Sequence, residues 1–267
     1  MEPILPIRIA QISDFHLFGK PEEVFYGLNT EKSFLAVLDL VKSAQPFDFC
    51  LLTGDLAQDH FDQTYQRLIH HITHTLPYPC YWLPGNHDDP ELMANIFAKT
   101  QIESNKSILI QDWHLILLNS HKPKSDAGYL AKTECDFLKT QLKNYPTHHT
   151  LVVLHHHPIK LDSTWLDSVM LENAAEFLEI IDNHHQIRGI VFGHVHQESE
   201  IYRNHIPYLS SPSTCVQFLP KSTPFKLDLN AHPGYRCIEL YPDGKIKTNI
   251  ERIKHLTGQV DPNAAGY

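Results

Sequence analysis

Several apolar segments of this 267-residue chain run directly into short polar motifs that contain aspartate, asparagine or histidine. The segment 7–13 ends in Asp14-Phe15-His16, and the segment 187–192 ends in Gly193-His194-Val195-His196. On an extended chain, side chains two positions apart point to the same face. Each motif therefore presents two polar side chains to one small volume, and the fold has to bring such strand ends together.

The spacing of apolar residues indicates alternating strands and helices, followed by strands alone. Helices are expected over residues 30–42, 62–75, 90–99, 133–143 and 171–183. Strands are expected over residues 7–13, 47–53, 80–83, 107–111, 114–119, 150–154 and 187–192, and then over 201–203, 208–209, 214–218, 235–240 and 245–251. Asp243-Gly244 is typical of a two-residue hairpin turn. This order predicts an α/β fold with two stacked sheets flanked by helices.

The polar motifs range from Asp14 to His196, so a site built from them needs all of these segments in one fold. We therefore expect a single domain over residues 1–254, large enough to bury a sizeable core. Residues 255–267 are polar and contain glycine and proline, which predicts a C-terminal tail on the surface.

The formal net charge of −9 argues against a general surface for nucleic acid or anionic membrane. It does not exclude a small anionic substrate, because bound divalent metals reverse the field locally. The five cysteines lack paired spacing, which favours reduced thiols in the cytoplasm. Residues 1–7 show no secretory signal, and no apolar run has the length of a membrane span.

One set of oxygen and nitrogen donors follows the predicted strands: Asp14, His16, Asp55, Asn86, His155, His194 and His196. Each has an ordinary explanation when taken alone, as a turn, cap or strand-end residue. In open α/β sheets, however, ligands gather outside the carboxyl ends of strands. A set without thiolates suits manganese, iron or zinc, and it exceeds what one tetrahedral ion needs, so two ions are implied.

Two divalent ions about 3.5–4 Å apart share ligands and lower the pKa of a water to about 7. They also bind phosphate oxygens and stabilise the charge that develops in an in-line displacement. The chain shows no G-x-S-x-G or P-loop pattern that would indicate another route. The donors therefore favour phosphoester hydrolysis.

The motifs, taken together, resemble the five blocks of the calcineurin-like metallophosphoesterases. They are Asp14-x-His16, Gly54-Asp55, Gly85-Asn86-His87-Asp88, His155-His156-His157-Pro158 and Gly193-His194-Val195-His196. Four further segments are similar to the bacterial class III cyclic nucleotide phosphodiesterases, namely residues 54–59, 165–167, 212–218 and the closing Gly266-Tyr267.

This resemblance implies a four-layer αββα sandwich and hydrolysis of 3′,5′-cyclic AMP to 5′-AMP, which would lower the intracellular cyclic AMP. It implies a first metal held by Asp14, His16, Asp55 and His196. It implies a second metal held by Asp55, Asn86, His155 and His194. His87 would protonate or hydrogen-bond the leaving 3′ oxygen. The implied substrate contacts are His16, Asp55, Asn86, His87 and His196.

Several alternatives stay open at the level of sequence. Only one of three consecutive histidines is an expected ligand, and we choose His155, with His156 as the fallback. The metal identity (iron, manganese or zinc), a preference for cyclic AMP over cyclic GMP, and a monomer or homodimer are not fixed. The base contacts are not assigned; the aromatic candidates are Phe18, Tyr26, Trp165 and Phe218, for which core packing is the commoner role. A glycerophosphodiester or nucleotide-pyrophosphate hydrolase, or a non-catalytic binding scaffold, are the alternative functions.

Overall fold

The computed structural model describes residues 5–98 and 100–263, and its strands form two six-stranded sheets and one small hairpin. The first sheet has the strand order β14-β13-β1-β4-β5-β6. Its strands are β1 (Ile7–Ile12), β4 (Phe49–Thr53), β5 (Cys80–Leu83), β6 (Ile102–Glu103), β13 (Gly234–Leu240) and β14 (Ile246–Arg252). Strands β1, β4, β5 and β6 are parallel, whereas β13 is antiparallel to both β1 and β14.

The second sheet has the strand order β11-β12-β10-β9-β8-β7. Its strands are β7 (Ser107–Ile110), β8 (Trp113–Leu117), β9 (His149–Leu154), β10 (Ile187–Phe192), β11 (Ser199–Arg203) and β12 (Ile206–Ser210). Strands β8, β9, β10 and β12 are parallel, and the two outer strands run antiparallel to their neighbours. Both large sheets are therefore mixed.

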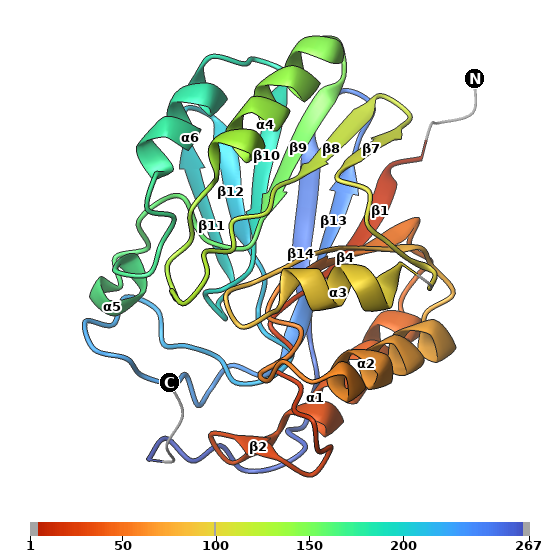
Figure 1. Cartoon of the computed structure of the whole chain (residues 1–267), viewed down its shortest axis with the longest axis vertical. Coiled ribbons are helices and arrows are strands. Elements are labelled where there is room, and N and C mark those ends of the chain that lie inside the picture. Colours follow the sequence, from red (N-terminus) through yellow and green to blue (C-terminus); the bar gives the residue numbers. More distant parts are fainter. Residues whose placement is uncertain (1–4, 99, 264–267) are drawn as a thin grey trace.

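Two groups of helices cover the outer faces of the sheets, as Figure 1 shows. The first sheet is covered by α1 (Thr30–Ser43), α2 (Asp62–Thr75) and α3 (Pro90–Phe97). The second sheet is covered by α4 (Lys132–Asn144) and α6 (Ala174–Asp182), with the short α5 (Thr164–Asp167) nearby. Asn29 caps α1 by accepting a hydrogen bond from the Lys32 amide at 2.8 Å, as its residue type predicts.

Three separate apolar clusters fill the spaces between these layers. On β1, Ile7 and Ile9 pack between the two sheets, while Ala10 and Ile12 pack against the helices of the first sheet. This alternation follows from the two-residue period of a strand. A third cluster lies between the second sheet and α4 and α6. The helix–sheet–sheet–helix layering confirms the predicted αββα sandwich.

Four local differences separate the structure from the predicted elements. The segment 214–218 forms no strand, because its backbone amides bond to loop atoms such as Ser13 O. The hairpin of β2 (Val24–Phe25) and β3 (Leu28–Asn29), the strand β6 and the helix α5 were not predicted, since each of these elements is only a few residues long. Position 99 of the predicted helix 90–99 and the closing Gly266-Tyr267 lie outside the described residues.

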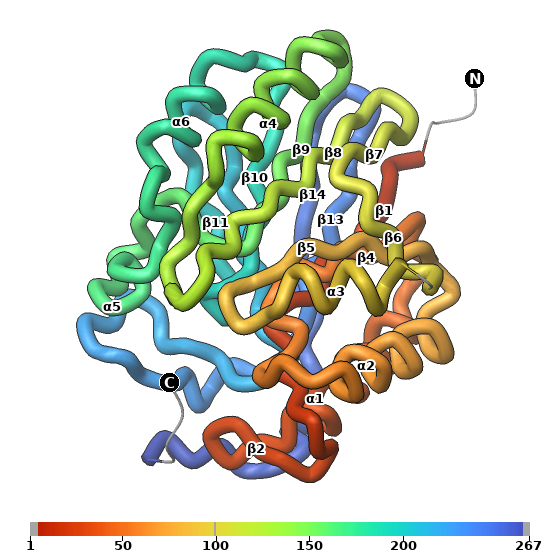
Figure 2. Tube along the Cα trace, viewed as in Figure 1, coloured from red at the N-terminus to blue at the C-terminus, as the bar shows by residue number. Residues whose placement is uncertain are grey.

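The division into a domain over residues 1–254 and a tail over 255–267 stays a prediction. In Figure 2 the C-terminal segment runs beside the β2–β3 hairpin. There the Asp261 amide donates a hydrogen bond to Tyr26 O at 2.8 Å. Among the described residues, no helix has both the length and the apolar character needed to span a membrane.

Candidate metal centre

The predicted donors lie at the carboxyl ends of five parallel strands, three in the first sheet and two in the second. Asp14 and His16 follow β1, Asp55 follows β4, Asn86 follows β5, His155 follows β9, and His194 and His196 follow β10. All are buried except Asn86, which is half-buried. The structure thus brings all seven predicted donors into one region.

A buried glutamine joins the two sheets just below these strand ends. Gln11, on β1, donates from Nε2 to Phe192 O of β10 at 2.9 Å and to Thr53 Oγ1 of β4 at 3.1 Å. These two hydrogen bonds fix the relative positions of the strands, although Gln11 Oε1 is buried and has no partner among the described residues. No sequence pattern indicates this role.

The backbone of the site is held in an unfavourable conformation. Asp14, His16, Asp55, His194 and His196 all have positive φ angles, between 45° and 69°. Non-glycine residues rarely adopt this region, and each instance costs on the order of 1 kcal/mol or more. The surrounding hydrogen bonds maintain this strain, which turns the side chains toward one another instead of along the strands.

Two glycines are required by close backbone approach. A Cβ atom on Gly85 would lie 2.1 Å from Asp55 Oδ1, and one on Gly193 would lie 2.2 Å from Ser13 Oγ. Neither neighbour is the end of a long flexible side chain, so neither can move aside. These glycines let the motifs around Asn86 and His194 pack against the motifs of β1 and β4.

One group of donors lies between Asp14 and Asp55. The Nε2 atoms of His16 and His196 are 3.0 Å apart. His196 Nε2 lies 3.5 Å from Asp14 Oδ1, and His16 Nε2 lies 3.8 Å from Asp55 Oδ2. This is the set that the family resemblance implies for the first metal.

The other group shares Asp55 and includes side chains from β5 and β9. His155 Nε2 lies 3.2 Å from both Asp55 Oδ2 and Asn86 Oδ1. The ring of His194 lies beside that of His155, with the ring centroids 5.1 Å apart. Asp55 therefore stands between the two groups, where a bridging ligand is expected.

Hydrogen bonds orient several of the histidine rings within the site. The Nδ1 atoms of His16, His155 and His196 lie 2.6–2.8 Å from Gln58 Oε1, Thr53 O and Val216 O respectively. Each Nδ1 must carry the proton to donate to these oxygens, so in the neutral form of each ring the Nε2 lone pair faces the centre. His194 is reversed: its Nε2 lies 3.2 Å from Val169 O. Its buried Nδ1 has no partner among the described residues.

These atoms fit a pair of cations. Histidine nitrogens and carboxylate oxygens lie 3–4 Å apart, and in most of these pairs neither atom carries a proton that could form a hydrogen bond to the other. Asp55 Oδ2 is buried and accepts no hydrogen bond from any described residue. Such repulsion is relieved when a positive ion occupies the space between the donors. Donors of this type suit divalent ions such as manganese, iron or zinc.

Burial and mutual charge shift the pKa values of these groups in opposite directions. Burial raises the pKa of Asp14 to about 7. Burial also opposes the charge on Asp55, but the positive charges of His155 and His87 bring the pKa of Asp55 well below its usual range. Burial disfavours charged His155, yet Asp55 raises the pKa of His155 to about 9. Burial lowers the pKa of His16 to about 4, which keeps its ring neutral and able to bind a metal.

His87 lies at the edge of the site with its ring half-buried. Its backbone amide donates to Asp55 Oδ1 at 2.9 Å, and its ring centroid is 5.0 Å from that of His16. An imidazole in this position can reach a group bound beside the donors without being one of the ligand set.

Asp88 supports the loops of the site, and no role was expected for it from the sequence. Its buried carboxylate accepts hydrogen bonds from the amides of Gly85 at 2.9 Å and Leu56 and Ala57 at 3.1 Å, and from Tyr65 Oη at 3.1 Å. It thereby ties the loop after β5 to the loop after β4. Asp88 directly follows Asn86 and His87 in the same motif, and this position could have indicated that it supports the site.

The three consecutive histidines have different surroundings. His155 faces Asp55 and Asn86, whereas His156 Nδ1 lies 2.8 Å from Ser120 Oγ. His156 still belongs to a group with His155 and His194 whose ligand atoms lie within 4.8 Å of one another. His157 Nε2 lies 3.9 Å from Asp167 Oδ1. The geometry favours His155 over the fallback His156.

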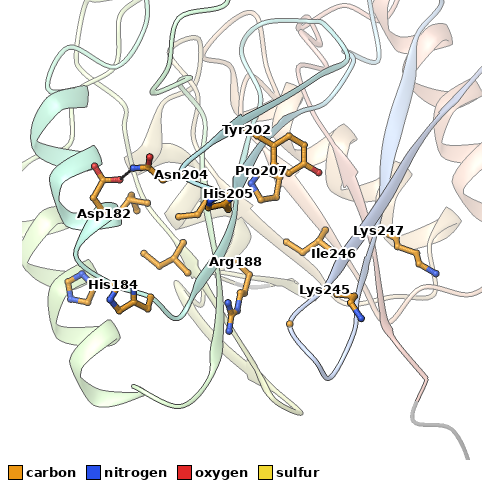
Figure 3. Close-up of a pocket in the computed structure, with 15 residues that line it drawn as sticks. Asp182, His184, Arg188, Tyr202, Asn204, His205, Pro207, Lys245, Ile246 and Lys247 are labelled. Atoms are coloured by element: carbon orange, nitrogen blue, oxygen red, sulfur yellow. Dashed lines mark hydrogen bonds between the residues drawn. The ribbon is translucent and has the colours of Figure 1, made fainter.

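A hollow of about 690 Å³ lies away from this site, at the start of β10 (Figure 3). Its rim carries Arg188, Lys245 and Lys247. Lys245 pairs with Asp243, and Asp182 pairs with Arg203. None of the seven predicted donors lines this hollow. Asp182, His184, His185 and His205 line it, but among the described residues none of them belongs to a group whose ligand atoms lie close enough to share a metal ion.

Comparisons with known proteins agree with this geometry. A family model described as calcineurin-like phosphoesterase matches residues 7–198. A 3′,5′-cyclic-nucleotide phosphodiesterase from Nostoc sp. is 40% identical over 256 residues, which are 96% of each chain. A 3′,5′-cyclic adenosine monophosphate phosphodiesterase from Escherichia coli K12 is 37% identical over 263 residues, 98% of this chain and 95% of that one.

Solved structures with far lower identity share the fold. A dimetal phosphatase from Danio rerio aligns with a TM-score of 0.65 at 10% identity, over 91% of this chain and 98% of that chain. A purple acid phosphatase from yellow lupin aligns with a TM-score of 0.64 at 13% identity, over 95% of this chain and 52% of that chain.

Proposed function

The chain belongs to the calcineurin-like phosphoesterase family, and we propose that it hydrolyses 3′,5′-cyclic AMP to 5′-AMP with two divalent metal ions. The observation that carries this proposal is the complete set of seven donors around Asp55. These donors occur in a chain that is 37–40% identical, over nearly its whole length, to the two named cyclic nucleotide phosphodiesterases.

We assign two metal positions that share Asp55. The first would be held by Asp14, His16, Asp55 and His196, and the second by Asp55, Asn86, His155 and His194. When bound, two such ions would supply a nucleophilic water at neutral pH and neutralise negative charge on the phosphate. The nitrogen and oxygen donors suit iron, manganese or zinc.

The protein's own groups then position the substrate and handle the proton. His16, Asp55, Asn86, His87 and His196 surround the place where the phosphate would lie. Attack of a water on phosphorus would break the bond from phosphorus to the 3′ oxygen, and the proton that the water loses would pass to solvent. His87 would supply the proton that the departing 3′ oxygen takes up and would regain one from solvent, so that 5′-AMP leaves with a free 3′ hydroxyl. General-acid help of this kind contributes about 10²–10⁴-fold.

The net charge and the cysteines bear on the partners and on the compartment of the protein, and both are compatible with a small substrate in the cytoplasm. The net charge of −9 disfavours nucleic acid and anionic membrane as partners. All five cysteines are buried free thiols. We propose that the protein acts in the cytoplasm as a monomer or homodimer and lowers cyclic AMP there.

A substrate panel tests the function. The protein, loaded in parallel with manganese, iron or zinc, would be assayed on 3′,5′-cyclic AMP, 3′,5′-cyclic GMP, 2′,3′-cyclic AMP and bis(p-nitrophenyl) phosphate. We expect hydrolysis of 3′,5′-cyclic AMP to 5′-AMP, and loss of activity with a chelator. Activity on bis(p-nitrophenyl) phosphate without any on 3′,5′-cyclic AMP would show another phosphodiesterase. A lack of any metal-dependent hydrolysis would favour a binding scaffold.

A further inference from the structure

An aromatic cavity of about 280 Å³ lies directly beside the metal centre. Its walls include Tyr26, Trp165, Phe218 and Phe225, and we call these four residues the aromatic pocket. Trp165 meets Phe218 and Phe225 edge-on, with ring centroids 5.0 and 4.9 Å apart, and Tyr26 stacks on Phe225 at 5.4 Å. The rings come from three separate segments of the chain and enclose one space.

Two contacts join this pocket to the metal centre. His194, which we assign to the second metal, forms part of the pocket wall. Phe218 stacks on the ring of His196 with a centroid distance of 4.0 Å and an interplanar angle of 6°. If the phosphate of a nucleotide lies at the metals, its ribose and base therefore lie next to this pocket.

The shape and chemistry of the pocket match a flat aromatic group that carries polar edges. Aromatic side chains hold bases by stacking, which tolerates different bases because each has a π face.

An acidic residue stands at the rim of the same cavity. Asp126 is exposed and lines the pocket, and its carboxylate oxygens can accept hydrogen bonds from a ligand. Adenine and guanine both carry an exocyclic amine that can donate to such a group. The rim is thus compatible with either purine, and the stacking walls do not select between them.

We propose that the aromatic pocket is the nucleobase subsite of this enzyme, with Trp165 as its main stacking surface. This inference rests on the proposed function, since it assumes a nucleotide whose phosphate lies at the metals. The ligand class is a purine nucleoside phosphate. Trp165 contributes to binding and leaves the metals and the proton on His87 unchanged.

The test separates the base from the phosphate by comparing two ligands. Binding of 5′-AMP and of ribose 5-phosphate, which lacks the base, would be measured by calorimetry on the metal-loaded protein. In the parent protein we expect 5′-AMP to bind more tightly. In Trp165→Ala the affinity for 5′-AMP should fall by about 5- to 150-fold, the range found for base stacking, while ribose 5-phosphate is unaffected.

Three further variants control for indirect effects. Trp165→Phe keeps a ring and should retain most of the advantage of 5′-AMP, and Phe225→Ala should lose part of it. Tyr202→Ala removes an aromatic ring that is 63% exposed on β11 and should change neither affinity. Metal content, measured in each variant, should stay at the parent level.

The possible failures can be told apart. If 5′-AMP keeps its full advantage over ribose 5-phosphate in both Trp165→Ala and Phe225→Ala, the pocket assignment is wrong and the proposed function stands. If the parent protein binds neither ligand and hydrolyses only bis(p-nitrophenyl) phosphate, the nucleotide function fails, and the pocket assignment fails with it.

Discussion

The proposed metal centre and the aromatic pocket lie side by side, yet they are built from different types of secondary structure. The metal centre consists of side chains that directly follow buried parallel strands, and five of its residues have strained backbone conformations. The aromatic pocket consists of rings from a hairpin, a four-residue helix and a loop. One region is polar and almost completely buried, and the other is apolar and only partly closed.

This difference matches the demands of the two tasks. Metal ligands must be held to within a fraction of an ångström, and paired strands with a tie such as Gln11 provide that rigidity. Base stacking tolerates small shifts of the rings, so loops suffice for it. Changes in the metal centre should therefore abolish chemistry, while changes in the aromatic pocket should weaken binding.

The largest effect is expected for Asp55→Ala. Because this carboxylate stands between both groups of donors, its loss should remove metal and reduce turnover by more than about 10⁴-fold. Metal content and hydrolysis of cyclic AMP would be measured together. Asp136→Ala, at an exposed position on α4, serves as the matched control and should behave like the parent. Two tightly held ions in Asp55→Ala would contradict the bridging assignment.

His87→Ala should separate chemistry from metal binding within the metal centre. We expect kcat to fall by about 10²–10⁴-fold, because the leaving oxygen loses its proton donor, while both ions remain. Metal analysis and steady-state kinetics check this, with the exposed His70→Ala as control. Turnover as fast as in the parent would show that His87 has no acid role.

Phe218→Leu should show an intermediate effect, because Phe218 belongs to the aromatic pocket and also stacks on His196. Groups that support a metal ligand typically contribute about 10–100-fold to metal affinity or activity. We expect both a raised KM and a weaker first metal, measured by kinetics across a metal titration. A change in KM alone would place Phe218 wholly with the base pocket and would sharpen the boundary between the two regions.

Gly27→Ala should have the smallest effect. Gly27 has a φ of +79°, and a Cβ atom there would lie 2.8 Å from Gln259 O in the C-terminal segment. The substitution should destabilise the protein by about 1 kcal/mol or more. It should raise KM for cyclic AMP by less than about tenfold. The effect is small because the neighbouring Tyr26 shifts its position in the aromatic pocket but keeps its ring. Urea unfolding and kinetics check it; an unchanged KM would show that Tyr26 does not depend on this packing.

The convergence of the seven donors could be predicted from the sequence much better than the residues that surround them. Donors such as Asp55 and His155 directly follow apolar runs, and the carboxyl ends of parallel strands meet at one edge of a sheet. The segment 214–218 shows the limit of that reasoning. It is apolar because it is buried beneath the site, where Val216 O accepts a hydrogen bond from His196, and not because it pairs in a sheet.

The aromatic pocket could be proposed only as separate candidate residues. Tyr26 and Trp165 were recognised as possible stacking residues, but Phe225 was not, and nothing in the spacing of these residues brings them together. Their meeting depends on loop paths and on the small β2–β3 hairpin, whose two-residue strands are too short to give a periodic signal. Likewise, Gln58 and Asp88 act through hydrogen bonds that connect loops distant in sequence.

The place of β13 and β14 in the first sheet bears on when the protein becomes active during its synthesis. Every proposed metal ligand has been translated by His196, yet β1, which leads into Asp14 and His16, pairs with β13, and β13 and β14 are made only after residue 233. We therefore expect a nascent chain to possess its entire ligand set well before it can hold that set in place. A chain released from the ribosome after His196 but before β13 is made would be inactive.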